Sequence, residues 1–288
     1  MKKYIILIIS IFILSSCDVE EGPFITGSNT YVNPDKKVLI EDFTGHLCPN
    51  CPNAARELDA IHDIYGDQII GMAIHVSTSF AKPSAIGSSF DYDFRTTWGD
   101  DWDTFYGISA MGLPRGMINR IGFPDNHKLG KGEWASKVAL ELNKDIDFKI
   151  YISSDNNSIS IISEAQNNLS SSYNLVICLT ESNIVNWQKD GGENVEDYVH
   201  NHVLRTILID ESLSNFSNFS TGQQIEKTIS YNLGTLEKEN IDYSTNNIAE
   251  LGNGNAGDWN ASNMSIVAYI YNTNTKEILQ VEEANLND

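Results

Sequence analysis

The chain has 288 residues, and 39 acidic against 19 basic side chains give it a formal net charge of −20. A protein this negative repels phosphate, which argues against nucleic acid or an anionic lipid surface as a partner. The length is sufficient for two domains, each with its own hydrophobic core.

The first 16 residues have the pattern of a signal peptide. Two lysines precede an apolar run from Tyr4 to Leu14, which is too short to span a membrane as a helix. The run ends at Leu14-Ser15-Ser16-Cys17, which resembles the cleavage box of bacterial lipoproteins. By that resemblance Cys17 is the lipidated first residue of the mature protein and its membrane anchor. The alternative is an ordinary secretory signal with an incidental cysteine, and both interpretations predict export.

Residues 17–36 are predicted to form a tether. Their glycines and prolines are typical of a linker, and Asp18, Glu20 and Glu21 follow Cys17 directly. Acidic residues at this place resemble the surface-export signal of Bacteroidetes lipoproteins, although they also suit a merely solvated tether.

A strand, a turn and a helix with a Cys-x-x-Cys pair begin the folded part of the chain. The apolar run from Val38 to Phe43 predicts a buried strand, Thr44 and Gly45 end it, and Asn53 to Tyr65 has helical spacing of apolar residues. Cys48 and Cys51 lie at the predicted helix start, where the helix dipole favours a thiolate. This pattern is a thioredoxin-like redox signature, with Cys48 as nucleophile and Cys51 as resolving thiol.

The same residues resemble the thioredoxin family position by position. Asp42 matches the buried aspartate of that family, from which the resemblance implies a proton acceptor for Cys51. The segment from Met111 to Arg120 resembles the family's cis-proline turn and following strand, which makes Pro114 the cis residue beside the thiols. The sequence departs from the family at Leu47, where tryptophan is usual, and at Pro49-Asn50, where Gly-Pro is usual.

Other roles for the cysteine pair are weaker. A structural bridge between Cys48 and Cys51 would close almost no loop and would stabilise the fold little. A zinc site would need two more ligands, and only His46 is close in sequence. A vestigial or structural pair remains the alternative to exchange-competent thiols. Cys178 lies in an apolar run and is predicted to be a small buried hydrophobe.

Residues 37–145 are predicted to form one thioredoxin-like α/β domain. Gln68 to Val76 indicates a second buried strand, and Glu133 to Lys144 indicates a closing helix. Between them the aromatic and acidic segment from Asp91 to Tyr106 is predicted to be partly helical. It either caps the thiols or packs as local core, and local core is favoured.

Residues 146–288 change to a period of two and predict an all-β domain. About seven strands without intervening helices suggest an immunoglobulin-like sandwich. The segment from Asp190 to Glu193 indicates an exposed turn, and Asn272 to Thr275, between the last two predicted strands, indicates a hairpin. The predicted strands are Phe148–Ile152, Ser158–Ile162, Tyr173–Thr180, His202–Ile209, Gln224–Tyr231, Met264–Tyr271 and Glu277–Val281.

A histidine pair in this second domain is a weak candidate for metal binding. His200 and His202 would face one side of a strand, where two imidazoles can ligate a metal. Spacing shows no third ligand, so a structural or hydrogen-bonded pair is favoured. We expect no metal and no cofactor.

The whole arrangement resembles the twenty-eight-kilodalton outer-membrane protein family of Bacteroidetes lipoproteins. The matching segments are Phe43 to Pro52, Gly112 to Arg120 and His200 to Arg205. The resemblance implies a lipid-anchored outer-membrane protein, on the periplasmic or the cell-surface face, with a thioredoxin-like domain before a β domain. The resemblance to this family does not imply an established activity.

Two functions from different classes follow. The first is extracytoplasmic thiol–disulfide exchange by Cys48 and Cys51, assisted by Asp42 and Pro114, on exported cysteine-containing proteins. The second is a non-catalytic surface binding or adhesion lipoprotein that holds a surface ligand and uses the thioredoxin-like domain as a scaffold. In both, the membrane contact is the lipid anchor at Cys17, and nucleic acid is not a partner.

Overall fold

The computed structural model describes residues 32–155, 157–247 and 251–287. The predicted signal peptide, the lipidation site Cys17 and most of the tether lie outside the described residues. The chain from residue 31 onward folds as one compact unit.

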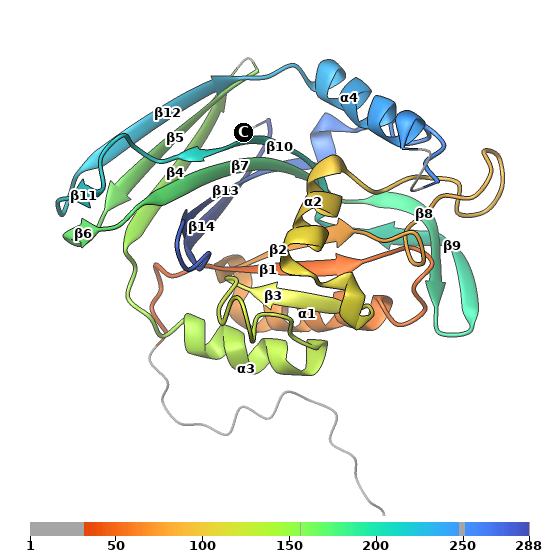
Figure 1. The fold of residues 1–288 in the computed structure, drawn as a ribbon, viewed down its shortest axis with the longest axis horizontal. Coiled ribbons are helices and arrows are strands. Elements are labelled where there is room, and N and C mark those ends of the chain that lie inside the picture. The colour runs from red at the N-terminus through yellow and green to blue at the C-terminus, as the bar shows by residue number, and fades with distance from the viewer. Residues whose placement is uncertain (1–31, 156, 248–250, 288) are drawn as a thin grey trace, which may run out of the picture. The chain divides into compact units, whose positions relative to one another are not determined.

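A seven-stranded mixed sheet runs through this unit in the order β14-β13-β7-β10-β2-β1-β3 (Figure 1). Strand β1 is parallel to β2 and antiparallel to β3, and β2 continues the sheet by a parallel pairing with β10. The strands are β1 (Val38–Thr44), β2 (Ile69–His75), β3 (Arg115–Ile118), β7 (Tyr173–Glu181), β10 (Val203–Ser212), β13 (Met264–Asn272) and β14 (Ile278–Asn285). The sheet therefore crosses the boundary expected between residues 145 and 146.

Helices cover both faces of the sheet around β1, β2 and β3. Helices α1 (Pro52–Tyr65) and α3 (Lys131–Glu141) bury their apolar residues in one cluster with alternate residues of β1. Helix α2 (Thr97–Tyr106) belongs instead to the cluster that contains Leu39 and Phe43 of β1. Because both faces are covered, every residue of β1 is buried.

A smaller three-stranded sheet covers the other end of the large one. It has the order β12-β5-β4 and consists of β4 (Phe148–Asp155), β5 (Ser158–Ala165) and β12 (Gln224–Ser230). Its apolar residues form one core with alternate residues of β7 and β13, such as Ile177 and Ile266. The short strands β6 (Leu169–Ser170) and β11 (Asn218–Phe219) pair with each other beside it.

Arg120, which follows β3, connects β1 with β13, two strands that lie far apart in the sequence. Its buried guanidinium donates to both carboxylate oxygens of Glu41 in β1 and to the hydroxyl of Tyr269 in β13, 2.8 Å away. Four aromatic rings surround the guanidinium, among them Trp102 of α2 at 5.0 Å. A buried charge is stable only when it is paired and hydrogen-bonded in this way.

The elements predicted from local patterns are present. The strand before the cysteines, the helix after them, the second strand and the closing helix appear as β1, α1, β2 and α3. The helical part of residues 91–106 is α2, which packs into the core. The predicted hairpin through Asn272 to Thr275 is the antiparallel pair β13–β14.

The immunoglobulin-like sandwich expected for residues 146–288 is not confirmed. Four strands from this part of the chain complete the sheet of β1, β2 and β3 rather than forming a separate sandwich. The expectation that no helix intervenes is wrong, because α4 covers Leu233–Asn246. Its sequence is largely polar, and its first turn is capped by Asn232, whose side chain accepts from the backbone N–H of Thr235.

The described part of the chain also contains a two-stranded hairpin, β8 (Ile184–Asp190) and β9 (Glu193–His200). Its turn at Gly191-Gly192 lies within the exposed turn predicted at residues 190–193. The hairpin itself has no predicted counterpart. We call it the cover hairpin because it lies over the loop that contains Cys48 and hydrogen-bonds to it.

Candidate active site

The cysteine motif lies in the connection between β1 and α1. The backbone N–H of Cys48 donates to the carbonyl of Gly45 over 2.9 Å, and α1 begins at Pro52 with Cys51 as its N-cap residue. Gly45 is required here because a Cβ atom at this position would clash with the carbonyl oxygen of Phe80. Cys51 thus occupies the helix start itself, and Cys48 precedes it by one turn.

The two cysteines form a disulfide. Their Cα atoms are 5.4 Å apart, and the side chains of Cys48 and Cys51 are 1% and 2% exposed. Cys178 is unpaired and buried in β7, where its Sγ contacts the carbonyl of Val267, in agreement with its predicted role as a buried hydrophobe. Burial raises the pKa of the Cys178 thiol, which keeps it protonated.

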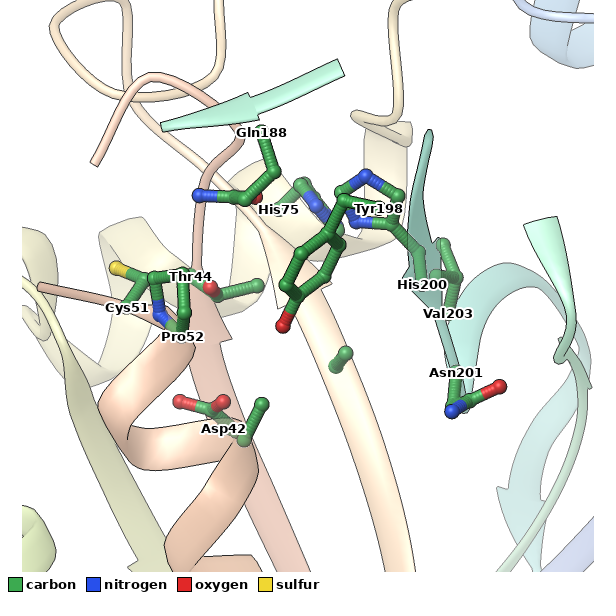
Figure 2. Close-up of a pocket in the computed structure, with 12 residues that line it drawn as sticks. Asp42, Thr44, Cys51, Pro52, His75, Gln188, Tyr198, His200, Asn201 and Val203 are labelled. Carbon is green, nitrogen blue, oxygen red and sulfur yellow. The ribbon is translucent and has the colours of Figure 1, made fainter. Parts of the chain in front are cut away.

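Asp42 is a buried carboxyl in β1. Its side chain has an Oδ1 atom without a hydrogen-bond partner among the described residues. Burial raises the pKa of Asp42 to about 8, since the charged form is deprived of water. Asp42 and Cys51 line the same cavity (Figure 2), so the structure brings together the carboxyl and the resolving cysteine that the sequence paired.

Pro114 lies directly before β3, and the peptide bond between Leu113 and Pro114 is cis, as the sequence indicated. Arg115 of β3 pairs with Phe43 of the antiparallel strand β1. Pro114 therefore lies toward the end of β1 at which the cysteine loop begins. Pro114 does not line the cavity shared by Asp42 and Cys51. A second cis bond, between Phe123 and Pro124, was not predicted.

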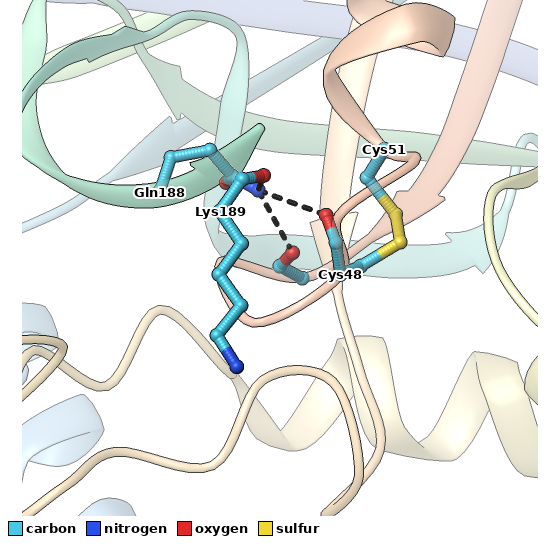
Figure 3. The surroundings of a disulfide bond; sticks show 5 residues. Cys48, Cys51, Gln188 and Lys189 are labelled. Atoms are coloured by element: carbon cyan, nitrogen blue, oxygen red, sulfur yellow. Dashed lines mark hydrogen bonds between the residues drawn. A yellow bond between two sulfur atoms is a disulfide. The ribbon is translucent and has the colours of Figure 1, made fainter. Parts of the chain in front are cut away.

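The cover hairpin lies over the disulfide and explains its burial. The side-chain amide of Gln188 donates to the carbonyls of Cys48 and Gly45, 3.2 and 3.3 Å away (Figure 3). Backbone N–H groups of the hairpin add bonds from Lys189 to the carbonyl of His46 and from Gly191 to that of Pro49. The cysteine loop is therefore held along its length by a segment 140 residues further along the chain.

An ion pair fastens the tip of the hairpin to α1. Arg56 donates to both carboxylate oxygens of Asp190, the closer one at 2.9 Å. Both side chains are substantially exposed, so this pair contributes little stability by itself. It does fix where the hairpin ends relative to the helix that begins at the disulfide.

Three aromatic or imidazole side chains that sequence reasoning did not place at the site line its cavity. They are His75 at the end of β2, Tyr198 in β9 and His200 at the end of β9. The rings of His75 and His200 are 5.7 Å apart, and Phe94 stacks against the first at 4.6 Å and tilts against the second at 4.5 Å. Burial lowers the pKa of His200 to about 3 and that of His75 well below its usual value.

The predicted arrangement of His200 and His202 is wrong. His200 ends β9, whereas His202 lies in the connection to β10 with a φ of 55°. Because of this turn the two rings do not lie on one side of a strand. His200 lines the cavity beside Cys51, and His202 lines a neighbouring cavity. Within the described ranges, no cluster of three or more histidine, cysteine or acidic side chains is arranged to hold a metal.

The fold and the site define a mixed α/β protein with a buried disulfide at a helix start. A model of the Omp28 outer membrane protein family matches residues 101–248, just over half of the chain. The chain therefore belongs to the Omp28 family, and it is an outer membrane lipoprotein. The matched residues include the cover hairpin and leave out Cys48 and Cys51. None of the described helices combines the length and apolar character needed to cross a membrane.

Two solved structures share the fold at low sequence identity, and a third matches part of the chain. HBP35 of Porphyromonas gingivalis superposes with a TM-score of 0.58 at 11% identity, over 88% of this chain and 76% of that one. A protein from Agrobacterium tumefaciens gives 0.52 at 11% identity, over 88% and 96%. A domain of the outer membrane lipoprotein Omp28 from Porphyromonas gingivalis matches at 17% identity over 50% of this chain and 91% of the domain, with a TM-score of 0.26. No curated protein matches the chain.

Proposed function

We propose that this lipoprotein is an extracytoplasmic thiol–disulfide exchange protein whose redox pair is Cys48 and Cys51. The observation that carries the proposal is a disulfide at the start of α1 that shares a cavity with the buried carboxyl of Asp42. A bridge between residues three apart closes too small a loop to stabilise the chain appreciably, so a chemical role accounts for it better than a structural one.

The proposal includes a thioredoxin-like arrangement for residues 37–145. It is supported by the order β1, α1, β2, β3, α3, by the parallel pairing of β1 with β2, and by the antiparallel pairing of β1 with β3. In this arrangement the loop that contains the cysteines directly follows a central buried strand. Pro114 approaches that end from the neighbouring strand.

The proposed exchange follows from the chemistry of thiolates. In the reduced protein the Cys48 thiolate attacks a substrate disulfide and forms a mixed disulfide, releasing one substrate thiolate. Cys51 then loses its proton to Asp42 and attacks the Cys48 sulfur, which releases the second substrate thiolate and restores the bridge. Asp42 suits this step because a carboxyl with a pKa of about 8 holds its proton about as tightly as an ordinary thiol, so a proton can pass between the two groups at little cost.

The substrates are proposed to be exported proteins that contain cysteines, reached from a membrane anchor at Cys17. With both cysteines almost fully buried, a polypeptide substrate reaches them only when the cover hairpin moves away. The hydrogen bonds that hold the hairpin are few, and each is worth about 1 kcal/mol net. Transient opening therefore fits the site.

Replacing one cysteine tests the proposal. The purified protein is reduced, and its exchange with a fluorescent model disulfide peptide is followed by the appearance of free peptide thiol. We expect Cys48→Ser to reduce the rate to that of the uncatalysed reaction, while Cys178→Ser, remote in β7, keeps the rate of the unmodified protein. Exchange that survives Cys48→Ser would refute the proposal.

The burial of the disulfide also supports a second candidate, a binding or adhesion lipoprotein for a surface ligand. In that case the bridge only shapes the loop on which the cover hairpin rests. The doubly substituted protein Cys48→Ser, Cys51→Ser would then bind host or bacterial surfaces as the unmodified protein does. Loss of binding without loss of folding would count against this candidate.

A further inference from the structure

A second cavity, which we call the side pocket, lies at the base of the cover hairpin. It has a volume of about 60 Å³, and its wall consists of Asp42 and residues from α1, β2 and the end of β9. Asp59, Val199 and Asn201 in this wall are exposed, so the pocket opens at the surface. The chain runs from β9 directly into the core strand β10. The side pocket is therefore formed while the hairpin covers the disulfide.

The side pocket contains a buried carboxyl that lacks a partner. Asp42 is 3% exposed, and its Oδ1 atom has no hydrogen-bond partner among the described residues. In Figure 2 the hydroxyl of Tyr198, which also lines the pocket, points toward this carboxyl. Buried polar atoms almost always have a partner. The wall of the pocket thus presents a free acceptor to a ligand that donates a hydrogen bond.

The charges around the pocket favour a cationic donor. Among the described residues, no lysine or arginine lines either cavity that contains Asp42 in its wall. Asp59 adds a second carboxyl near the surface, while Arg56 of the same helix is already paired with Asp190. Burial lowers the pKa of His202, which keeps this ring neutral. The formal net charge of −20 also attracts a cation from a distance.

The rest of the wall is largely apolar and suits an alkyl stem. Its apolar residues are Ala55, Leu58, Ala73 and Val199. A water-sized group occupies about 10–15 Å³ of a cavity, so the side pocket holds about four to six such groups. That capacity matches the methylene and ammonium groups of a lysine side chain. Lysine buries its stem against apolar surface in the same way on protein surfaces.

We propose that the side pocket is a specificity subsite that binds a lysine side chain of the polypeptide substrate. The ammonium group donates to the carboxylate of Asp42, the stem lies against the apolar wall, and Asp59 attracts the charge from the surface. The inference rests on the proposed exchange function and names its substrate class. Because Asp42 also lines the cavity beside Cys51, the bound lysine is close to the reacting cysteine of the substrate. The preferred substrates are exported segments with a lysine near a cysteine.

Binding of an ammonium group is linked to the charge on Asp42. Burial raises the pKa of this carboxyl to about 8, so in the empty pocket it holds a proton at neutral pH. A bound ammonium group favours the carboxylate and expels that proton. The affinity for the cation therefore rises with pH up to about 8 and is constant above it, which makes binding about tenfold tighter at pH 9 than at pH 7.

The other groups that face Asp42 do not produce this pH dependence. The closed bridge at Cys51 does not titrate. Burial keeps the nearby imidazoles neutral, and it raises the pKa of Tyr198 to about 12. Asp59 is exposed. The imidazoles in the two cavities belong to His75, His200 and His202, and burial lowers the pKa of each.

The first arm of the test uses n-butylammonium as a probe and n-butanol as its neutral counterpart, with the full chain and the bridge closed. Backbone amide shifts around the pocket measure binding, and the ¹³C shift of the Asp42 carboxyl measures its pKa. We expect n-butylammonium to lower the Asp42 pKa by about one unit and to bind more tightly at pH 9 than at pH 7. Equal binding of the two probes would overturn the inference.

Three variants locate the binding site of the probe. Asp42→Asn should abolish the preference for n-butylammonium over n-butanol. Asp59→Asn should weaken n-butylammonium binding by about twofold to fivefold, as expected for one exposed charge. The matched control is Asp63→Asn, an exposed residue of α1 that does not line the pocket, and it should bind as the unmodified protein does. A preference that survives Asp42→Asn, in a variant whose circular dichroism is unchanged, would overturn the inference.

The second arm compares model disulfide peptides that have lysine, norleucine or glutamate next to the cysteine. We expect the lysine peptide to have a KM about tenfold below that of the norleucine peptide, as one charge-assisted hydrogen bond predicts. The glutamate peptide should have the highest KM. Asp59→Asn should narrow these differences, and Asp63→Asn should preserve them. Probe binding without a preference for the lysine peptide would assign the pocket to a free amine and overturn its assignment to the substrate.

The two arms separate failure of the subsite from failure of the proposed function, because the probe arm requires no exchange. Exchange of all three peptides with one KM, in a protein that does not bind n-butylammonium, would overturn the subsite and leave the function standing. Binding of n-butylammonium at Asp42 in a protein that exchanges none of the peptides would support an ammonium site and refute the function.

Discussion

At the scale of single residues, Asp42 is a buried carboxyl that burial alone destabilises in its charged form. It lies in a strand whose residues are all buried, and none of the described residues gives it a cationic partner to offset the loss of water. The buried carboxylate Glu41, its neighbour, is compensated by Arg120 instead. A carboxyl retained without such compensation is typical of a functional rather than a stabilising role.

The raised pKa of Asp42 predicts how stability depends on pH. The folded protein keeps this proton up to about pH 8, whereas the unfolded chain releases it near its ordinary value of 3.8. The folded state therefore binds more protons between these values, and its free energy of unfolding falls as the pH rises through that window.

Asp42→Asn removes this dependence because an amide does not titrate. With the disulfide closed in both proteins, we expect the variant to be more stable than the unmodified protein by about 3–5 kcal/mol at pH 8, and to differ little at pH 4. Chemical denaturation at several pH values measures the difference. A difference that stays constant from pH 4 to pH 8 would contradict the assignment.

At the scale of elements, the cover hairpin controls access to the disulfide. Its contacts with the cysteine loop include hydrogen bonds to the carbonyls of Gly45, His46, Cys48 and Pro49. The tip is exposed, and the pair Arg56–Asp190 beside it is a surface ion pair. An element held in this way opens more readily than the core strands.

Gln188→Ala removes the two side-chain bonds to the cysteine loop. The two bonds together are worth about 2 kcal/mol, so opening of the hairpin becomes about 30-fold more frequent. We expect the rate at which a cysteine-containing peptide reduces the bridge to rise by the same factor. Asn194→Ala, on the exposed strand β9, serves as the control and should not change the rate. Equal rates for all three proteins would show that the hairpin does not limit access.

At the scale of the whole molecule, the large sheet unites parts of the chain that the sequence assigned to different domains. Strand β2 pairs with β10 across more than a hundred residues, and Arg120 bonds to both Glu41 and Tyr269. The cover hairpin reaches the cysteines from the same distant part of the chain. The site is therefore completed by residues far from its motif.

This arrangement explains what sequence reasoning could and could not predict. The strand at Val38, the helix after Cys51 and the hairpin through Asn272 are specified by short-range periodicity and turn residues, and all are present. The pairing of β2 with β10 and the approach of Gln188, Tyr198 and His200 depend on which sheet edges meet. Local patterns do not contain that information, because the same alternation suits a sandwich or a shared sheet.

The reduction potential of the Cys48–Cys51 pair tests the central claim most directly. It is measured by equilibrating the protein with defined ratios of reduced and oxidised dithiol and quantifying the free cysteines, with Cys178→Ser to remove the third thiol. An exchange protein should give a value between about −120 and −270 mV. A value below about −300 mV would identify a structural bridge and contradict the proposed exchange.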